Sequence, residues 1–179
     1  MSRKILIVVD MQNDFTYGAL RNEDAIAIIP NVSAKVKSAL DEGTDVIFTR
    51  DTHTEEYMNT EEGRNLPVPH CIEGSSGWEI IDELKSYEKE AAAVIDKYTF
   101  GSDTLGELLQ SKYKDVEEVE LIGICTDICV ISNALLTKAF LPNAHVKVDA
   151  SCCAGVTPDS HNTALEAMKA CHVEVTGQE

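Results

Sequence analysis

The chain has 179 residues, enough for one ordinary domain with a full hydrophobic core. Its apolar fraction of 44% and charged fraction of 26% are typical of a soluble globular protein. The net charge of −16 disfavours a nucleic-acid partner, and no apolar run reaches the ~20 residues that a membrane span needs. We therefore expect a single domain over residues 1–179 with neither nucleic acid nor membrane as a partner.

The first apolar run, residues 5–9, is too short for the apolar region of an export signal and ends on a carboxylate. We interpret this run as part of a strand and take a cytoplasmic location as the default expectation. Six cysteines occur at irregular spacing. In a chain without an export signal this spacing favours free thiols over a disulfide framework.

Strands and helices are expected to alternate along the whole chain. In the first half we expect a strand at 4–9, a helix at 31–42, a strand at 45–49, a long loop from 51 to about 78, and a short helix at 78–85. In the second half we expect a strand at 93–95, a helix from 102 or 103 to about 113, a strand at 118–124, a helix to about 140, a strand at 145–148, a helix from 157, and a strand at 172–175. This order predicts a three-layer α/β/α sandwich around a six-stranded parallel sheet.

Four reactive side chains fall at or just after the ends of predicted strands, namely those of Asp10, Asp51, Lys97 and Cys129. The carboxyl ends of parallel strands meet at one edge of a sheet, where α/β proteins carry out their chemistry. Each residue alone has an ordinary interpretation, because a cysteine is usually a small core residue, an aspartate often caps a turn, and a lysine is usually solvated. As a set at strand ends, they predict an active site.

Cys129 is the candidate nucleophile. It follows an apolar strand and a tight turn, so we expect it at a helix N-terminus, where unpaired N–H groups and the dipole favour a thiolate. Attack on a carboxamide needs a base for the thiol proton and a proton donor for leaving ammonia. We assign the proton relay to Asp10 and stabilisation of the thiolate to Lys97. His161, near the start of the last predicted helix, is interpreted as a capping or surface residue.

A second group of polar residues predicts a metal site in the long loop. Asp51 and His53 lie two residues apart in an extended segment, so their side chains point to one side. Glu62 and His70 come from the same loop, and this mixture of carboxylates and imidazoles suits Zn²⁺, Mn²⁺ or Fe²⁺. A polar loop that merely contains two histidines is the alternative. Two rivals to the glutamate ligand remain open, namely Glu61 and Asn59.

The motifs around these residues resemble those of a known family. They are Val9-Asp10-Met11-Gln12-Asn13-Asp14-Phe15, Arg50-Asp51-Thr52-His53, Pro69-His70-Cys71-Ile72-Glu73-Gly74, Lys97, Gly123-Ile124-Cys125-Thr126-Asp127-Ile128-Cys129-Val130 and Ala154-Gly155-Val156-Thr157. Over nearly its whole length the chain resembles the isochorismatase-like cysteine hydrolases and, within them, the nicotinamidase (pyrazinamidase) branch.

The resemblance implies a role for each matching residue in the candidate active site. Cys129 would be the nucleophile, Asp10 the acid–base group and Lys97 the third member of the triad. It also implies a cis peptide bond between Ile124 and Cys125, and an oxyanion hole formed by the backbone N–H groups of Cys125 and Cys129. Such a donor typically contributes ~3–4 kcal/mol to lowering the barrier.

The resemblance further implies a metal site and a ring pocket. The implied ligands of one divalent ion, zinc first and Mn²⁺ or Fe²⁺ as alternatives, are Asp51, His53, Glu62 and His70. Phe15 would pack against the substrate ring. The family often has an aromatic residue a few positions before the second metal histidine, whereas this chain has Leu66-Pro67-Val68-Pro69 there. Tyr98 or Phe100 could line the pocket instead.

The implied reaction is hydrolysis of nicotinamide to nicotinate and ammonia through a thioester, in the salvage of the nicotinamide cofactor. The expected partners are a small amide substrate and further copies of the chain in a homo-oligomer. Another cysteine amidase of the superfamily, acting on a carbamoyl or ureido substrate, is the nearest alternative. A non-catalytic protein that senses thiols or metals on the same fold is the alternative from another class.

Overall fold

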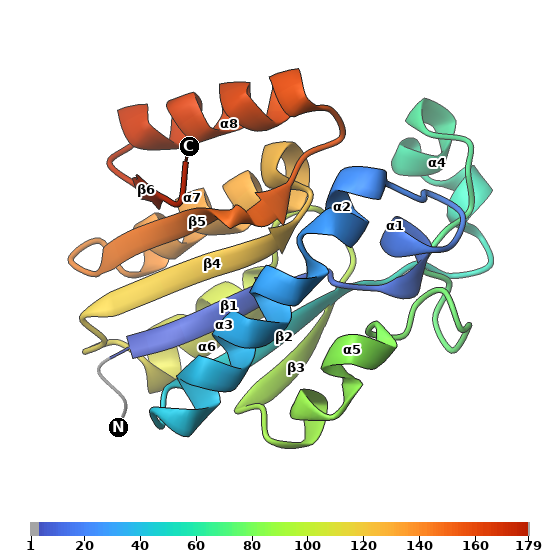
Figure 1. Ribbon diagram of the computed structural model, residues 1–179. Coiled ribbons are helices and arrows are strands. Elements are labelled where there is room, and N and C mark those ends of the chain that lie inside the picture. The colour runs from blue at the N-terminus through green and yellow to red at the C-terminus, as the bar shows by residue number, and fades with distance from the viewer. Residues whose placement is uncertain (1–3, 179) are drawn as a thin grey trace.

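The computed structural model describes residues 4–178, so residues 1–3 and 179 of the expected domain lie outside it. Its centre is a six-stranded parallel sheet in the order β3-β2-β1-β4-β5-β6 (Figure 1). The strands are β1 (Lys4–Val9), β2 (Asp45–Asp51), β3 (Ala93–Lys97), β4 (Glu118–Ile124), β5 (His145–Ala154) and β6 (Glu174–Thr176). The six-stranded parallel sheet predicted from the sequence is therefore confirmed.

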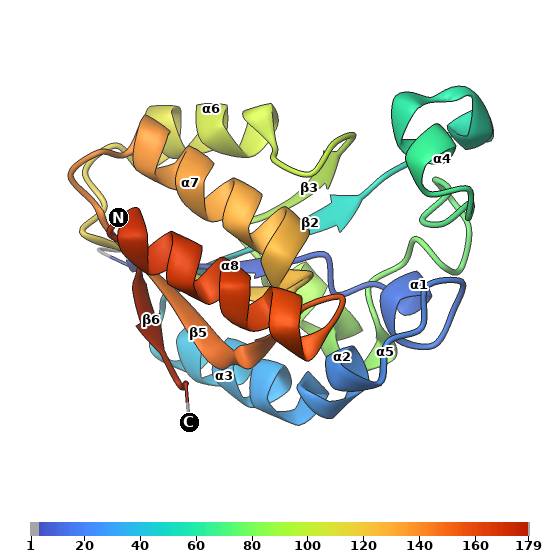
Figure 2. The same ribbon diagram turned by 90° about the horizontal axis from the view of Figure 1, so that it is seen from above.

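Helices cover both faces of the sheet and complete the predicted sandwich. They are α1 (Asn13–Thr16), α2 (Glu23–Ala27), α3 (Ile29–Asp41), α4 (Glu61–Asn65), α5 (Asp82–Lys85), α6 (Asp103–Lys112), α7 (Ile131–Phe140) and α8 (Pro158–Ala170). Figure 2 shows α6, α7 and α8 on one side of the sheet and α2, α3 and α5 on the other. The short helices α1 and α4 lie beyond the carboxyl ends of the strands (Figure 2).

The first strand explains why a continuous apolar run predicts a central strand. Ile5, Ile7 and Val9 pack into the hydrophobic cluster that contains residues of α6, α7 and α8. Leu6 and Val8 pack into the second cluster, which contains residues of α2, α3 and α5. All five side chains are at most 2% exposed. Because successive side chains point to opposite faces, a strand that is covered on both sides must be apolar at every position.

Several boundaries differ from the predictions, and most differences concern the carboxyl edge. β2 extends to Asp51 and β3 to Lys97, so these two residues end their strands rather than follow them. β5 is longer than predicted and has an irregular register with β4, and β6 begins two residues later than expected. The expected short helix at 78–85 is only α5, and the helix expected at 31–42 begins at Ile29.

The segment predicted as one long loop from 51 to about 78 contains regular structure, so that prediction was wrong in part. This segment contains a 3-10 turn, Tyr57–Asn59, and helix α4, whose N-terminus is capped by the Thr60 side chain through Gly63 N–H. Helices α1 and α2 were not predicted. At four and five residues they are too short to show a 3.6-residue periodicity.

A close approach of two strands lies directly beneath the candidate site. Gly123 has φ +117°, and a Cβ atom there would lie 2.1 Å from the Val9 carbonyl oxygen. Only glycine fits this conformation and this space. The peptide bond between Ile124 and Cys125 is cis, as the family resemblance implied. Over residues 4–178, none of the helices is both long and apolar enough to cross a membrane.

Candidate active site

Four neighbouring strands bring the predicted residues together at the carboxyl edge of the sheet. Asp10 follows β1, Asp51 ends β2 and Lys97 ends β3. Cys129 lies in a π-helical turn, Thr126–Val130, that connects β4 to α7. The expected place at the start of a helix is therefore confirmed, although the first turn is π-helical. All six cysteines are free thiols.

Lys97 is the centre of this group. Its ammonium lies 2.7 Å from Asp10 Oδ2 and 3.4 Å from Cys129 Sγ. It also donates to Asp51 Oδ1 at 3.1 Å and to the Thr99 carbonyl oxygen at 3.2 Å. The side chains of Lys97 and Asp10 are fully buried. A buried ammonium that contacts a thiol and two carboxylates is a charge arrangement suited to moving a proton within the group.

Burial controls the protonation of this group. Burial raises the pKa of the Cys129 thiol well above its usual value, and Lys97 offsets only part of this effect. Burial therefore opposes the effect expected of the helix N-terminus, which favours a thiolate. Burial also raises the pKa of Asp10, against the opposing charge of Lys97. A carboxylate with a raised pKa is a stronger base toward a nearby thiol proton.

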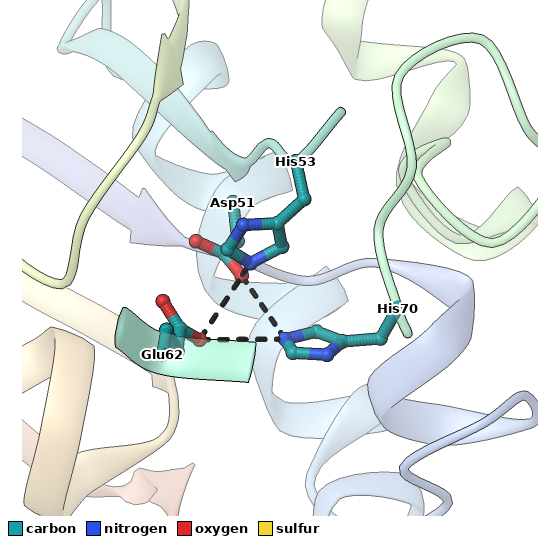
Figure 3. A group of neighbouring side chains, drawn as sticks. All are labelled: Asp51, His53, Glu62 and His70. Carbon is teal, nitrogen blue, oxygen red and sulfur yellow. Dashed lines mark hydrogen bonds and ion pairs between the residues drawn. The ribbon is translucent and has the colours of Figure 1, made fainter. Parts of the chain in front are cut away.

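The predicted metal residues converge in a second group beside the first (Figure 3). One ligand atom from each of Asp51, His53, Glu62 and His70 lies within 4.8 Å of all the others. The Nε2 atoms of His53 and His70 lie 2.9 and 3.4 Å from Asp51 Oδ2. Glu62 Oε1 lies 3.6 and 3.8 Å from the same two nitrogens. Two imidazole nitrogens and two carboxylates form a donor set that fits a zinc-type ion.

The surroundings hold these ligands in place. His70 Nδ1 lies 2.8 Å from the Val68 carbonyl oxygen, which favours a proton on Nδ1 and leaves Nε2 for a metal. Burial alone would raise the pKa of Asp51, but hydrogen bonds with both imidazoles and the charge of Lys97 hold that pKa below its usual value. Between the rival ligands, α4 presents Glu62 to the group, whereas the Asn59 amide is bonded to Glu56.

Both groups adjoin one pocket of ≈ 970 Å³. Its wall includes Cys125, Cys129 and Phe15, whose ring meets that of His70 edge-on with centroids 5.6 Å apart. The two residues that the resemblance assigned to an oxyanion hole therefore border the pocket. Tyr98 and Phe100 also line it, as the sequence allowed. Asp10 and Lys97 are not part of the wall and lie buried behind the thiol.

Two side chains that fix the site were not predicted. The fully buried Gln12 accepts a hydrogen bond from Asp51 N–H at 2.7 Å and donates to the Asp51 carbonyl oxygen at 2.9 Å. Asp14 Oδ2 accepts from Cys71 N–H at 2.7 Å and so holds the loop segment that carries His70. Both residues are part of the first motif. Their position just after a strand-end carboxylate was the available signal.

The interpretation of His161 as a capping or surface residue was wrong. Its Nδ1 atom lies 2.7 Å from Thr126 Oγ1, in the turn that carries Cys129, and its side chain is half-buried. Just before α8, the Val156 N–H donates to Asp127 Oδ1 at 3.0 Å. Helix α8 is capped instead by Thr157, whose side chain accepts a hydrogen bond from Ser160 N–H. His161 therefore links α8 to the turn beneath the pocket.

The fold and the site together define a class of protein: an α/β/α sandwich whose parallel sheet carries a buried thiol, ammonium and carboxylate at its carboxyl edge. A family model described as the isochorismatase domain matches residues 4–179. The chain belongs to the isochorismatase family.

The chain is similar to known proteins over almost its full length. The nicotinamidase/pyrazinamidase of Mycobacterium tuberculosis is 30% identical over 96% of this chain and 97% of its own. The nicotinamidase of Schizosaccharomyces pombe is 24% identical over 97% of this chain and 92% of its own. Among solved structures, the pyrazinamidase of Pyrococcus horikoshii in complex with zinc has a TM-score of 0.85 at 28% identity, covering 99% of this chain and 100% of that one.

Proposed function

We propose that the protein hydrolyses nicotinamide to nicotinate and ammonia through a thioester on Cys129. The observation that carries this proposal is the contact of Lys97 with both Cys129 Sγ and Asp10, beside a pocket that also contains the four-ligand group. The similarity to nicotinamidases over nearly the whole chain supports the same reaction.

The proposed steps use the contacts of the triad. Asp10 accepts the thiol proton of Cys129, and the sulfur attacks the amide carbon. The backbone N–H groups of Cys125 and Cys129 stabilise the oxyanion, and Lys97 compensates the negative charge that passes between thiol and carboxylate. The proton goes to the leaving nitrogen, which departs as ammonia. Water then attacks the thioester, giving its proton to the thiolate through Asp10, and nicotinate leaves.

Asp51, His53, Glu62 and His70 would hold one divalent ion, with zinc as the first candidate and manganese or iron as alternatives. The donor set and the Nδ1 hydrogen bond of His70 support this assignment. A bound ion would supply a Lewis-acid anchor for the pyridine nitrogen. Phe15, which packs against His70, would cover one face of the ring. The structure with zinc among the similar proteins is consistent with this choice of metal.

The pocket wall disfavours the alternative carbamoyl or ureido substrates that carry a carboxylate. Arg21 is the one arginine or lysine in the wall, and its guanidinium lies 2.7 Å from Glu23. The remaining charged residues of the wall are acidic, namely Glu23, Asp51, Glu61 and Glu62. A neutral amide is therefore the better match. We extend the proposal to a role in cofactor salvage, in the cytoplasm and as a homo-oligomer.

The test is ammonia release from nicotinamide by the purified protein, measured as isolated, after chelation and after addition of Zn²⁺. We expect release that falls on chelation and returns with the metal. Cys129→Ala should abolish turnover, and Cys171→Ala, at an exposed thiol outside the pocket wall, is the matched control. Near-normal turnover by Cys129→Ala would refute the mechanism. Turnover that is indifferent to chelation would refute the metal anchor alone.

A further inference from the structure

The pocket is much larger than one ring requires. A cavity of about 150 Å³ already holds a molecule the size of benzene, and pockets for drug-sized ligands span about 300–1,000 Å³. This pocket measures ≈ 970 Å³. The thiol and the four-ligand group account for only part of its wall. A further part is formed by the segment before α2, helix α4, the loop after β3 and the segment before α8.

Exposed apolar side chains are concentrated in that further part of the wall. Within residues 4–178, large apolar side chains that are well exposed are Tyr17, Met58, Leu66, Tyr98, Phe100, Leu135 and Val156. Four of these line the pocket, namely Leu66, Tyr98, Phe100 and Val156. They come from three separate segments of the chain. Their exposed fractions are 38, 66, 43 and 56%, so they form its outer rim. Apolar groups that gather at the rim of a pocket indicate a ligand surface.

The ring geometry decides which part of a substrate would reach this rim. With the pyridine nitrogen at the four-ligand group and the carboxamide at Cys129, the two anchored ring positions are meta to each other. The ring carbon between them, C2, lies on the side of both anchors, and C5 lies diametrically opposite. A substituent on C5 therefore points away from both anchors. We propose that the rim formed by Leu66, Tyr98, Phe100 and Val156 is a second subsite that binds an uncharged apolar substituent at C5 of a pyridine-3-carboxamide.

This inference rests on the proposed function and names a wider substrate class for the same site. The charge of the wall restricts that class further. Arg21 is already paired with Glu23, and the wall has no other arginine or lysine, so an anionic substituent would meet Glu23 and Glu61 without a free ammonium or guanidinium partner. The subsite should therefore accept alkyl and phenyl groups and reject a carboxylate of similar size.

The experiment compares kcat/KM for nicotinamide with its 5-methyl, 5-ethyl, 5-propyl, 5-phenyl and 5-carboxylate derivatives, using the metal-loaded protein. Burial of one methylene corresponds to a factor of up to about fourfold, so kcat/KM should rise two- to fourfold at each step of the alkyl series. The phenyl derivative should be turned over at least as efficiently as nicotinamide. The carboxylate should be at least tenfold poorer than nicotinamide.

Substitutions at the rim test whether the gain in kcat/KM for alkyl derivatives arises there. Val156→Ser and Leu66→Ser should each lower the ratio of kcat/KM for 5-propylnicotinamide to that for nicotinamide by about threefold or more. Leu135→Ser, at an equally exposed apolar residue outside the pocket, should leave this ratio unchanged. A ratio that no rim variant changes would overturn the inference.

The experiment distinguishes a failure of the subsite from a failure of the proposed function. If nicotinamide is hydrolysed but every 5-alkyl derivative is rejected, the subsite is wrong and the proposed function stands. If sedimentation also shows a dimer that Val156→Ser dissociates, a second copy of the chain occupies the rim. If nicotinamide itself is not hydrolysed by the metal-loaded, reduced protein, the proposed function fails and the subsite with it.

Discussion

Replacing Lys97 by methionine is the most revealing single change that the structure suggests. The substitution keeps most of the side-chain volume and removes the charge. It leaves Asp10 and Asp51 as buried carboxylates that have lost an ammonium at 2.7 and 3.1 Å. Removing one partner of a buried ion pair typically costs 3–5 kcal/mol, because the remaining charge is uncompensated. We expect a loss of ~3–5 kcal/mol in the free energy of unfolding.

This loss can be measured by denaturant unfolding of the metal-free protein at neutral pH. For a chain of this length, 1 kcal/mol corresponds to about 2–4 °C, so the melting temperature should fall by roughly 6–20 °C. The double variant Lys97→Met/Asp10→Asn should be more stable than the single variant, because one of the unpaired charges is gone. If Lys97→Met is as stable as the unaltered protein, or if the second change brings no recovery, our account of the buried charges is wrong.

Three further predictions concern the metal, the strand contact and the turn. Glu62→Gln should weaken zinc binding at least tenfold in competition with a chromophoric chelator, whereas the neighbouring Glu61→Gln should change it less than twofold. Gly123→Ala should destabilise the fold by more than 3 kcal/mol in denaturant unfolding, because its Cβ would overlap the backbone of β1 at a positive φ. His161→Ala and Thr126→Val should each lower kcat about tenfold with little change in KM, and the double variant should be no worse than either alone. Equal additive losses would contradict the proposed link between these two residues.

The sequence was sufficient for the sheet because its strands carry strong local signals. The run at 4–9 is apolar at every buried position, and this pattern alone indicates a strand covered on both faces. Helices α1, α2 and α4 have no comparable signal. Each is four or five residues long. Distant segments hold α1 and α2, through the bonds from Asn13 Nδ2 to the Ser76 carbonyl oxygen and from Asn22 Nδ2 to the Gly155 carbonyl oxygen. Tertiary contacts of this kind are invisible to periodicity.

The same division holds for the candidate site. Asp10, Asp51, Lys97 and Cys129 could be found because parallel strands end at a common edge. The rise in the pKa of the Cys129 thiol could not be predicted, because it results from burial that only the packed structure reveals. His161 was misjudged for a related reason. Its partner Thr126 is 35 residues away, and no spacing rule connects a helix start to a turn at that distance.

The shared position of Lys97 makes the two halves of the site one electrostatic unit. Its ammonium joins the carboxylate next to the thiol to a carboxylate of the four-ligand group. A mutation at Asp51 would therefore change the charge balance around Cys129 even if Asp10 and Cys129 stayed in place. Removing a carboxylate from either group would therefore change the share of the Lys97 charge that is left for the other group.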